Sequence, residues 1–131
     1  MARDWVLITD DSDFMRLKLE QIVDSLGYEP LPAADGNAAL PAADGNAALE
    51  AFERVLPPIV LLDVEMPEPN GIEVCRRIRE LSAETFIIMV TSDHRADVVE
   101  EAIEAGANDY VSKPFTADRL KSAFDRRYDA A

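Results

Sequence analysis

Short apolar runs alternate along this chain with longer stretches in which apolar residues recur every three to four positions. A continuous apolar run is typical of a strand buried on both faces, and the longer spacing is typical of an amphipathic helix. The pattern predicts strands within 5–11, 28–32, 59–63, 86–91 and 108–114. It predicts helices within 12–28, 48–56, 72–81, 96–106 and 116–130.

Individual residues indicate where these elements begin and end. Gly27 and Gly106 follow helical patterns and are expected to end them, and Thr116 is placed to cap the last helix. The segment 28–32 carries two prolines, so its strand is expected near an edge of the sheet. In the first helix, the apolar residues near helical spacing are Phe14, Leu17, Ile22 and Leu26.

Five strands that alternate with five helices predict an α/β protein. Its parallel sheet would be covered by helices on both faces, because the strands are apolar throughout. Ligands of such sheets bind beyond the carboxyl ends of the strands. The length of 131 residues fits one domain spanning 1–131.

Charge and composition disfavour nucleic acids and membranes as binding partners of this chain. The chain has 26 acidic and 13 basic residues, a formal net charge of −13, which disfavours binding to nucleic-acid phosphates. No segment approaches the roughly 18 consecutive apolar residues of a membrane helix. The first residues, MARDW, lack the pattern of a signal peptide. We therefore expect a cytoplasmic protein that binds neither nucleic acid nor membranes.

The single cysteine and the single histidine do not indicate a metal site. Cys75 lies at helical spacing from Ile72 and Ile78, and it is expected to pack in the core. His94 alone cannot build a zinc site of several imidazoles, and it is expected on the surface near a helix start.

Polar residues stand where the apolar strands end. They are Asp10 and Asp11 after the first strand, Asp63 after the third, Thr91 and Ser92 after the fourth, and Ser112, Lys113 and Pro114 after the fifth. The carboxyl ends of parallel strands share one edge, so these groups should converge. Three carboxylates at close range would have raised pKa values unless a cation compensates them, and Mg²⁺ prefers such oxygen ligands.

A carboxylate beside Mg²⁺, a lysine and a hydroxyl can perform phosphoryl transfer. The metal and the lysine neutralise charge on the transferred group. An aspartate can be the nucleophile and form an aspartyl phosphate. The sequence thus favours a phosphoryl-transfer site at this edge of the sheet.

Four motifs at these positions resemble the receiver domain of two-component response regulators, especially the chemotaxis type. They are VLITDD (6–11), LLDVEMPEPNG (61–71), VTS (90–92) and SKPF (112–115). The resemblance covers essentially the whole chain apart from a nine-residue excess. It implies a flavodoxin-like doubly wound fold, with a five-stranded parallel sheet in the order 2-1-3-4-5 and five helices.

The resemblance also implies a role for each residue of the metal and phosphoryl site. Asp63 looks like the phosphoacceptor and a metal ligand. Asp11 looks like a direct Mg²⁺ ligand with Asp10 as its partner, and the main-chain carbonyl of Glu65 looks like a further ligand. Lys113 looks like the residue that contacts the phosphoryl oxygens.

Four further roles concern switching and phosphoryl lifetime. Thr91 looks like the hydroxyl that moves toward the phosphoryl group, and Tyr110 looks like the aromatic switch on the last strand. Glu65 and Asp93 lie two residues after Asp63 and Thr91. Both acids are expected to flank the path of the attacking water and to tune the phosphoryl lifetime, in a direction that the sequence leaves open.

By this resemblance the chain is a signalling protein that catalyses only its own phosphorylation and dephosphorylation. The donor would be a sensor histidine kinase or a phosphotransfer protein. The responding face would be formed by the fourth helix, the fifth strand and the fifth helix. That face would bind an output protein of unknown identity and is a candidate for self-association.

Two other interpretations stay open. A haloacid-dehalogenase-like phosphatase also forms an aspartyl phosphate with Mg²⁺, but its signature places a second aspartate where this chain has Glu65, and its cap insertion is missing. A receiver-like module could instead bind partners without being phosphorylated. Steady turnover of a phosphate ester would support the first, and failure to take up a phosphoryl group would support the second.

The nonapeptide PAADGNAAL occurs at 32–40 and again, unchanged, at 41–49. Each copy follows a leucine, Leu31 or Leu40. The first copy can therefore keep the connection to the preceding strand, and the second copy can keep the connection to the following helix. Nine residues at about 100° each turn a helix face by roughly 180°, so they cannot smoothly extend a helix. We expect a loop or a short helical turn within 35–44, with Leu49 and Phe52 packed in the core; a short extra helix is the alternative.

Overall fold

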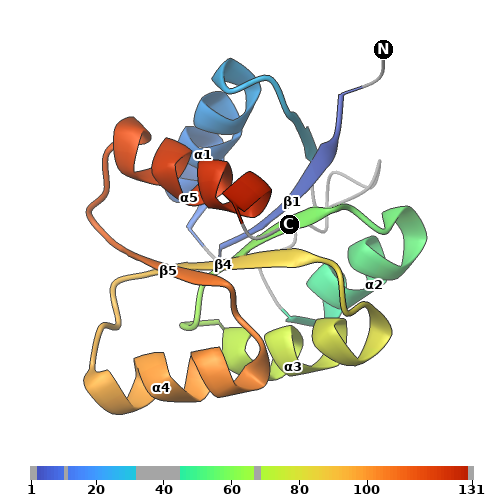
Figure 1. Cartoon of the computed structure of the whole chain (residues 1–131), viewed down its shortest axis with the longest axis vertical. Helices are drawn as coiled ribbons and strands as arrows, with labels where there is room; N and C mark the ends of the chain where they lie inside the picture. Colours follow the sequence, from blue (N-terminus) through green and yellow to red (C-terminus); the bar gives the residue numbers. More distant parts are fainter. Residues whose placement is uncertain (1–2, 11, 32–44, 67–68, 130–131) are drawn as a thin grey trace.

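The computed structural model describes residues 3–10, 12–31, 45–66 and 69–129 (Figure 1). The strands are β1 (Trp5–Thr9), β2 (Glu29–Leu31), β3 (Ile59–Leu62), β4 (Phe86–Thr91) and β5 (Asp109–Ser112). The helices are α1 (Asp13–Ser25), α2 (Gly45–Val55), α3 (Gly71–Leu81), α4 (Ala96–Ala105) and α5 (Ala117–Asp129). Asp11 and the expected loop at 35–44 lie outside the described residues.

The five strands form one parallel sheet in the order β2-β1-β3-β4-β5. This order confirms the flavodoxin-like fold that the sequence predicted. The proline-containing strand β2 lies at an edge, as expected, because proline cannot donate a ladder hydrogen bond. The opposite edge is β5, with α4 on one side of the sheet and α5 on the other (Figure 1).

Helices cover both faces of the sheet (Figure 1). One core contains side chains of α2, α3 and α4, and the other contains side chains of α1 and α5. Cys75, Leu49 and Phe52 are buried in the first core, as predicted. The strands β1, β3 and β4 lie between the two cores, which explains why their sequences are apolar throughout.

Of the four apolar residues that the sequence indicated in α1, Ile22 and Leu26 pack against the core, whereas Phe14 and Leu17 do not. Phe14 is 76% exposed and Leu17 is 54% exposed, whereas Leu19 and Val23 are buried. Ser12 caps this helix by accepting a hydrogen bond from the Met15 main-chain N–H, which fixes where the helix begins. Packing against the sheet buries Leu19 and Val23 and leaves Phe14 and Leu17 at the surface.

Several predicted helix ends are confirmed. Gly27 and Gly106 both have positive φ angles, of 95° and 117°, which glycine adopts without steric cost. Thr116 precedes α5 and accepts a hydrogen bond from the Arg119 main-chain N–H at 3.1 Å. His94 is exposed close to the start of α4, as expected. Among the helices of the described residues, none combines the length and apolar character of a membrane span.

Candidate functional site

The polar residues that the sequence placed at strand ends meet at one edge of the sheet. Asp10 follows β1, Asp63 follows β3, Thr91 ends β4, and Lys113 follows β5. Asp10, Asp63 and Thr91 are 1%, 4% and 0% exposed, although all three are polar. Buried polar side chains need partners, so their contacts define what this edge can do.

Lys113 joins the two buried carboxylates. Its Nζ lies 2.6 Å from Asp10 Oδ2 and 2.8 Å from Asp63 Oδ2, in hydrogen-bonded ion pairs. Burial raises the pKa of Asp10, and the hydrogen bond from Lys113 offsets this only in part. Burial acts to lower the pKa of Lys113, but its hydrogen bonds to Asp10 and Asp63 outweigh that effect and raise it. The lysine is therefore held as a cation between two carboxylates.

Main-chain groups fix the orientation of Asp63. Its Oδ1 accepts a hydrogen bond from the Glu65 main-chain N–H at 2.9 Å, while Oδ2 faces Lys113. The start of α3 packs against the same residue, because a Cβ added to Gly71 would lie 2.0 Å from the Asp63 carbonyl oxygen. Asn70 caps α3 at this point by accepting a hydrogen bond from the Glu73 main-chain N–H. Both carboxylate oxygens of Asp63 thus have defined positions.

Asp10 is fixed by the first turns of α1. Its Oδ1 accepts a hydrogen bond from the Ser12 main-chain N–H at 2.9 Å. The Arg16 guanidinium donates to the Asp10 carbonyl oxygen at 2.6 Å. The sequence alone indicated no role for Arg16, and the available signal was its position one helical turn beyond Ser12.

The described residues provide oxygen ligands of the kind that a hard divalent cation binds, and they supply part of a complete ligand set. Asp10 and Asp63 present carboxylate oxygens at the same buried edge, which is the donor type that Mg²⁺ takes. Among the residues that the structure describes, no three His, Cys, Asp or Glu side chains form a metal-binding group. The third predicted carboxylate, Asp11, lies outside that set of residues.

A chain of hydrogen bonds connects Thr91 with Tyr110. The Asp93 main-chain N–H donates to Thr91 Oγ1 at 3.2 Å. The Tyr110 hydroxyl donates to the main-chain carbonyl of the same Asp93. Burial, followed by the nearby negative charge of Asp93, raises the pKa of Tyr110 to about 12. The loop that follows β4 therefore links the buried hydroxyl of the site to the half-buried aromatic ring on β5.

Two acids, Glu65 and Asp93, lie at the rim of the site, and each has its own partner. Ser92 Oγ donates to Glu65 Oε1 at 2.8 Å. The Arg95 guanidinium donates to both carboxylate oxygens of Asp93, at 3.0 and 2.8 Å. The hydrogen bond from Arg95 lowers the pKa of Asp93. The sequence alone assigned these contacts to neither Ser92 nor Arg95, because spacing does not show which way a loop side chain points.

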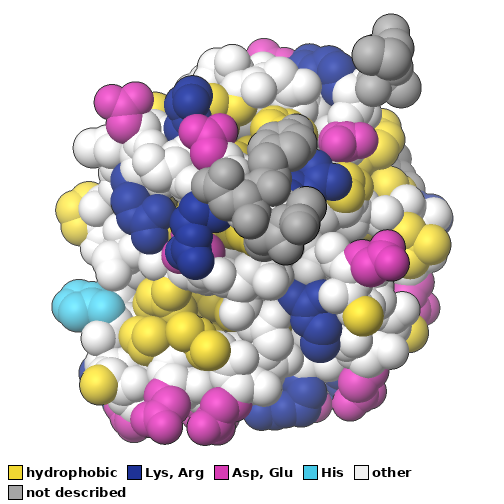
Figure 2. Space-filling view, in the orientation of Figure 1, with side chains coloured by type: hydrophobic (Ala, Val, Ile, Leu, Met, Phe, Trp, Pro, Cys, Tyr) yellow, Lys and Arg dark blue, Asp and Glu magenta, His cyan; other side chains and the backbone are white. Residues whose placement is uncertain are grey.

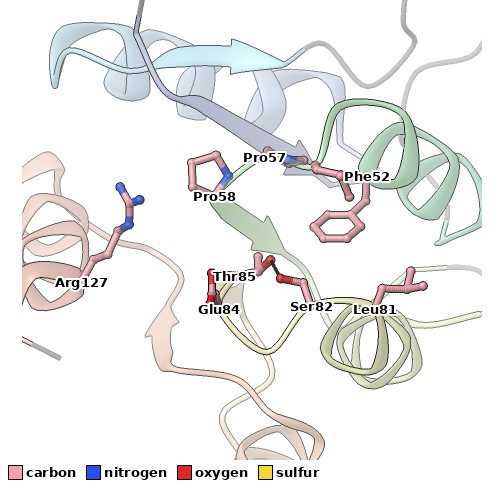
Figure 3. A pocket seen from close by; sticks show the side chains of 9 residues that line it. Phe52, Pro57, Pro58, Leu81, Ser82, Glu84, Thr85 and Arg127 are labelled. Carbon is pink, nitrogen blue, oxygen red and sulfur yellow. Dashed lines mark hydrogen bonds between the residues drawn. The ribbon is translucent and has the colours of Figure 1, made fainter. Parts of the chain in front are cut away.

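A cavity lies at the other end of the strands, where β3 and β4 begin (Figure 3). It has a volume of about 330 Å³, and its lining includes Phe52, Leu56, Pro58, Leu81 and Arg127. It shares no residue with the edge that carries Asp10, Asp63 and Lys113. It therefore takes no part in the chemistry of that edge.

Comparison with known proteins agrees with this geometry. The family model described as the response regulator receiver domain matches residues 6–125. The chain belongs to this family. It is 34% identical over 121 residues to the chemotaxis protein CheY of Bacillus subtilis, covering 92% of this chain and 94% of that protein.

Solved structures of receivers share the fold. Chemotaxis protein CheY4 of Vibrio cholerae superposes with a TM-score of 0.82 at 28% identity, covering 95% of this chain and 98% of that one. A CheX–CheY–BeF₃–Mg²⁺ complex from Borrelia burgdorferi matches with a TM-score of 0.83 at 26% identity, covering 97% and 90%.

The chain is a phosphoacceptor response-regulator receiver of two-component signalling. Receiver domains are signalling modules, which separates this chain from enzymes that turn over an external substrate. Neither the phosphatase nor the phosphorylation-independent module is favoured by these relationships.

Proposed function

We propose that Asp63 is the residue that accepts the phosphoryl group. The observation that carries this assignment is a buried carboxylate with one oxygen held by the Glu65 main-chain N–H and the other facing Lys113. An Asp63 oxygen would form the new bond to phosphorus as the donor's bond to phosphorus breaks, and the leaving group would depart with its electron pair. Lys113 would neutralise charge on the transferred oxygens.

The donor class is a sensor histidine kinase or a phosphotransfer protein, and small acyl phosphates provide a simple substitute in vitro. The chain itself would catalyse both phosphorylation and later hydrolysis, without an external substrate to turn over. Its net charge of −13 supports the expectation that nucleic acid is not a direct partner.

The test of this proposal is uptake of a phosphoryl group by the whole chain. The chain is incubated with acetyl phosphate and Mg²⁺, and its intact mass is measured. We expect one added phosphoryl mass in the unaltered chain, none in Asp63→Asn, and normal uptake in the exposed control Asp118→Asn. Full uptake by Asp63→Asn would overturn the assignment, and steady release of phosphate with multiple turnovers would favour the phosphatase alternative.

Mg²⁺ is the proposed cofactor. Asp10 and Asp63 would hold it, and the resemblance adds Asp11 and the Glu65 main-chain carbonyl. When bound, the ion supplies positive charge near the transferred oxygens. Ligand that binds only the native state stabilises it by about 2.7 kcal/mol at a hundredfold excess over Kd. We therefore expect millimolar Mg²⁺ to raise Tm, and expect Asp10→Ala to reduce that rise; an equal rise in both proteins would contradict the site.

The proposed switch runs from Thr91 to Tyr110. Phosphorylation would draw Thr91 toward the new charge, which would disturb the hydrogen bonds through Asp93 and allow Tyr110 to turn inward. Hydrophobic side chains gather between α4 and β5 on this side of the molecule (Figure 2). They would form part of the face of α4, β5 and α5 that binds the output protein or a second copy.

NMR tests the switch separately from the chemistry. Beryllofluoride with Mg²⁺ replaces the phosphoryl group, and backbone shifts are followed along the chain. We expect changes to extend from Asp63 through residues 91–124. Light scattering of the same samples measures self-association. Changes confined to the neighbourhood of Asp63 would contradict a working switch.

A further inference from the structure

Glu65 is hydrogen-bonded both to Asp63, which follows β3, and to Ser92, which follows β4. Its main-chain N–H is bonded to Asp63 Oδ1, so the residue begins directly above the acceptor. Its carboxylate is held by Ser92 Oγ at 2.8 Å, which belongs to the loop after the neighbouring strand β4. The Glu65 side chain thus connects the loops that follow β3 and β4.

The other acid at the rim, Asp93, is held by a different partner. Asp93 is engaged through both carboxylate oxygens by Arg95, and its main-chain N–H is bonded to Thr91. The pairing with Arg95 directs the Asp93 carboxylate toward the start of α4. Glu65 is therefore the carboxylate whose placement depends on Ser92.

We propose that Ser92 is a positioning residue that holds Glu65 across the mouth and thereby prolongs the life of the aspartyl phosphate. This inference rests on the proposed role of Asp63. In hydrolysis, a water oxygen bonds to phosphorus as the phosphorus–Asp63 bond breaks. The water's proton leaves to solvent or phosphate, and the Asp63 carboxylate is regenerated. A carboxylate fixed across the approach obstructs that water and repels anionic donors.

Loss of the Ser92 hydroxyl should raise both the rate of phosphoryl uptake and the rate of hydrolysis. Ser92→Ala removes the hydroxyl that holds Glu65, and both residues are exposed, so the fold should be unaffected. Hydrolysis of the phosphorylated chain and uptake from acetyl phosphate should both accelerate by about two- to ten-fold, the range expected from loss of one hydrogen bond. Ser92→Thr keeps a hydroxyl and should restore both rates to nearly their original values.

A double-mutant cycle separates positioning from a general structural effect. The rates are measured for the unaltered chain, Ser92→Ala, Glu65→Ala and the double variant. We expect Ser92→Ala to have no further effect once Glu65 is absent. The same acceleration in the Glu65→Ala background would overturn the proposal, as would unchanged rates in Ser92→Ala.

NMR of the unphosphorylated chain tests the structural half of the proposal. Side-chain couplings of Glu65 should show one dominant rotamer in the unaltered chain and averaging in Ser92→Ala. Identical Glu65 couplings in the two proteins would contradict the positioning role. Complete lack of phosphoryl uptake by the unaltered chain would contradict the proposed function instead, so the two failures are distinguishable.

Discussion

At the scale of single residues, Lys113 determines the electrostatic character of the site. It is the cation between two buried carboxylates, and each of its ion pairs is also a hydrogen bond. Without it, Asp10 and Asp63 would face each other at the buried edge with neither opposing charge nor the donor that now satisfies them. Such groups are costly to leave unpaired in a protein interior.

Removal of this cation should destabilise the fold. We expect Lys113→Ala to lower the free energy of unfolding at pH 7, without Mg²⁺, by about 1–3 kcal/mol, because buried acceptors lose their donor. The control Lys121→Ala breaks an exposed pair with Asp125 and should change it by less than about 1 kcal/mol. Urea unfolding measures both. Equal losses in the two variants would show that Lys113 behaves as an ordinary surface lysine.

The raised pKa of the Tyr110 hydroxyl should be visible in the pH dependence of stability and of tyrosine absorbance. Its pKa is raised to about 12, so the unfolded chain ionises first as the pH rises above 10, and the stability contributed by this tyrosine is lost between about pH 10 and 12. Tyr110→Phe should lose less stability over that window and should lack the highest-pH step in tyrosine absorbance. The variant should also be about 0.5–1.5 kcal/mol less stable at pH 7 through loss of one hydrogen bond. An unchanged absorbance titration in Tyr110→Phe would refute this environment.

Spacing along the sequence was enough to place Asp10, Asp63, Thr91 and Lys113 together, because each directly ends or follows a buried parallel strand. It could not assign the partner of Glu65. The hydrogen bond from Ser92 depends on how two loops from different strands approach one another. Loop side-chain direction is set by such tertiary contacts rather than by periodicity.

At the scale of elements, the start of α3 determines the geometry around Asp63. Asn70 caps the helix, and Gly71 follows so close to Asp63 that a Cβ would overlap the Asp63 carbonyl oxygen. The chain can therefore turn from β3 into α3 directly over the acceptor. A helix that began later would not pack against this backbone.

Gly71→Ala should consequently slow phosphorylation of Asp63, because the added methyl must displace the Asp63 backbone. Gly27→Ala is a matched control, since its Cβ would meet nothing within 4 Å and only its positive φ angle is strained. Both variants should lose about 1–3 kcal/mol of stability, by overpacking and by backbone strain respectively. Acetyl phosphate uptake should fall several-fold only in Gly71→Ala. Normal uptake in that variant would mean that the α3 start does not control the site.

The existence and approximate bounds of the elements followed from periodicity, and the strand order followed from the resemblance to receiver domains. The buried face of α1 followed from neither. The strands lie between two cores and are apolar throughout, so their identity does not depend on the choice of face. In α1, apolar residues occur on more than one side, and Phe14 and Leu17 proved to be exposed. Contact with the sheet decides which side is buried.

At the scale of the whole molecule, the start of α2 comes from the end of the second copy of the nonapeptide. Gly45, Ala48 and Leu49 belong to that copy and are buried in α2. Phe52 follows them into the same core. Extra length between two elements costs only a logarithmic entropy term, so we expect the duplication to be tolerated.

Deleting residues 32–40 should therefore preserve function. The remaining copy supplies the same connection and the same helix, and the site on the other strands is unchanged. We expect phosphorylation of Asp63 to stay within a few-fold of the unaltered rate and stability to rise modestly. Acetyl phosphate uptake and urea unfolding measure the two effects. Loss of folding or of phosphorylation would reveal a structural role for the first copy.

The position of the phosphoryl group is the central question for the molecule, and chemical trapping answers it most directly. Borohydride reduces an aspartyl phosphate to homoserine, and peptide mass spectrometry then locates the altered residue. After treatment with acetyl phosphate and Mg²⁺, we expect homoserine at position 63 and unmodified aspartate at position 10. Homoserine at any other position, with Asp63 intact, would contradict the assignment of Asp63 as the phosphoacceptor.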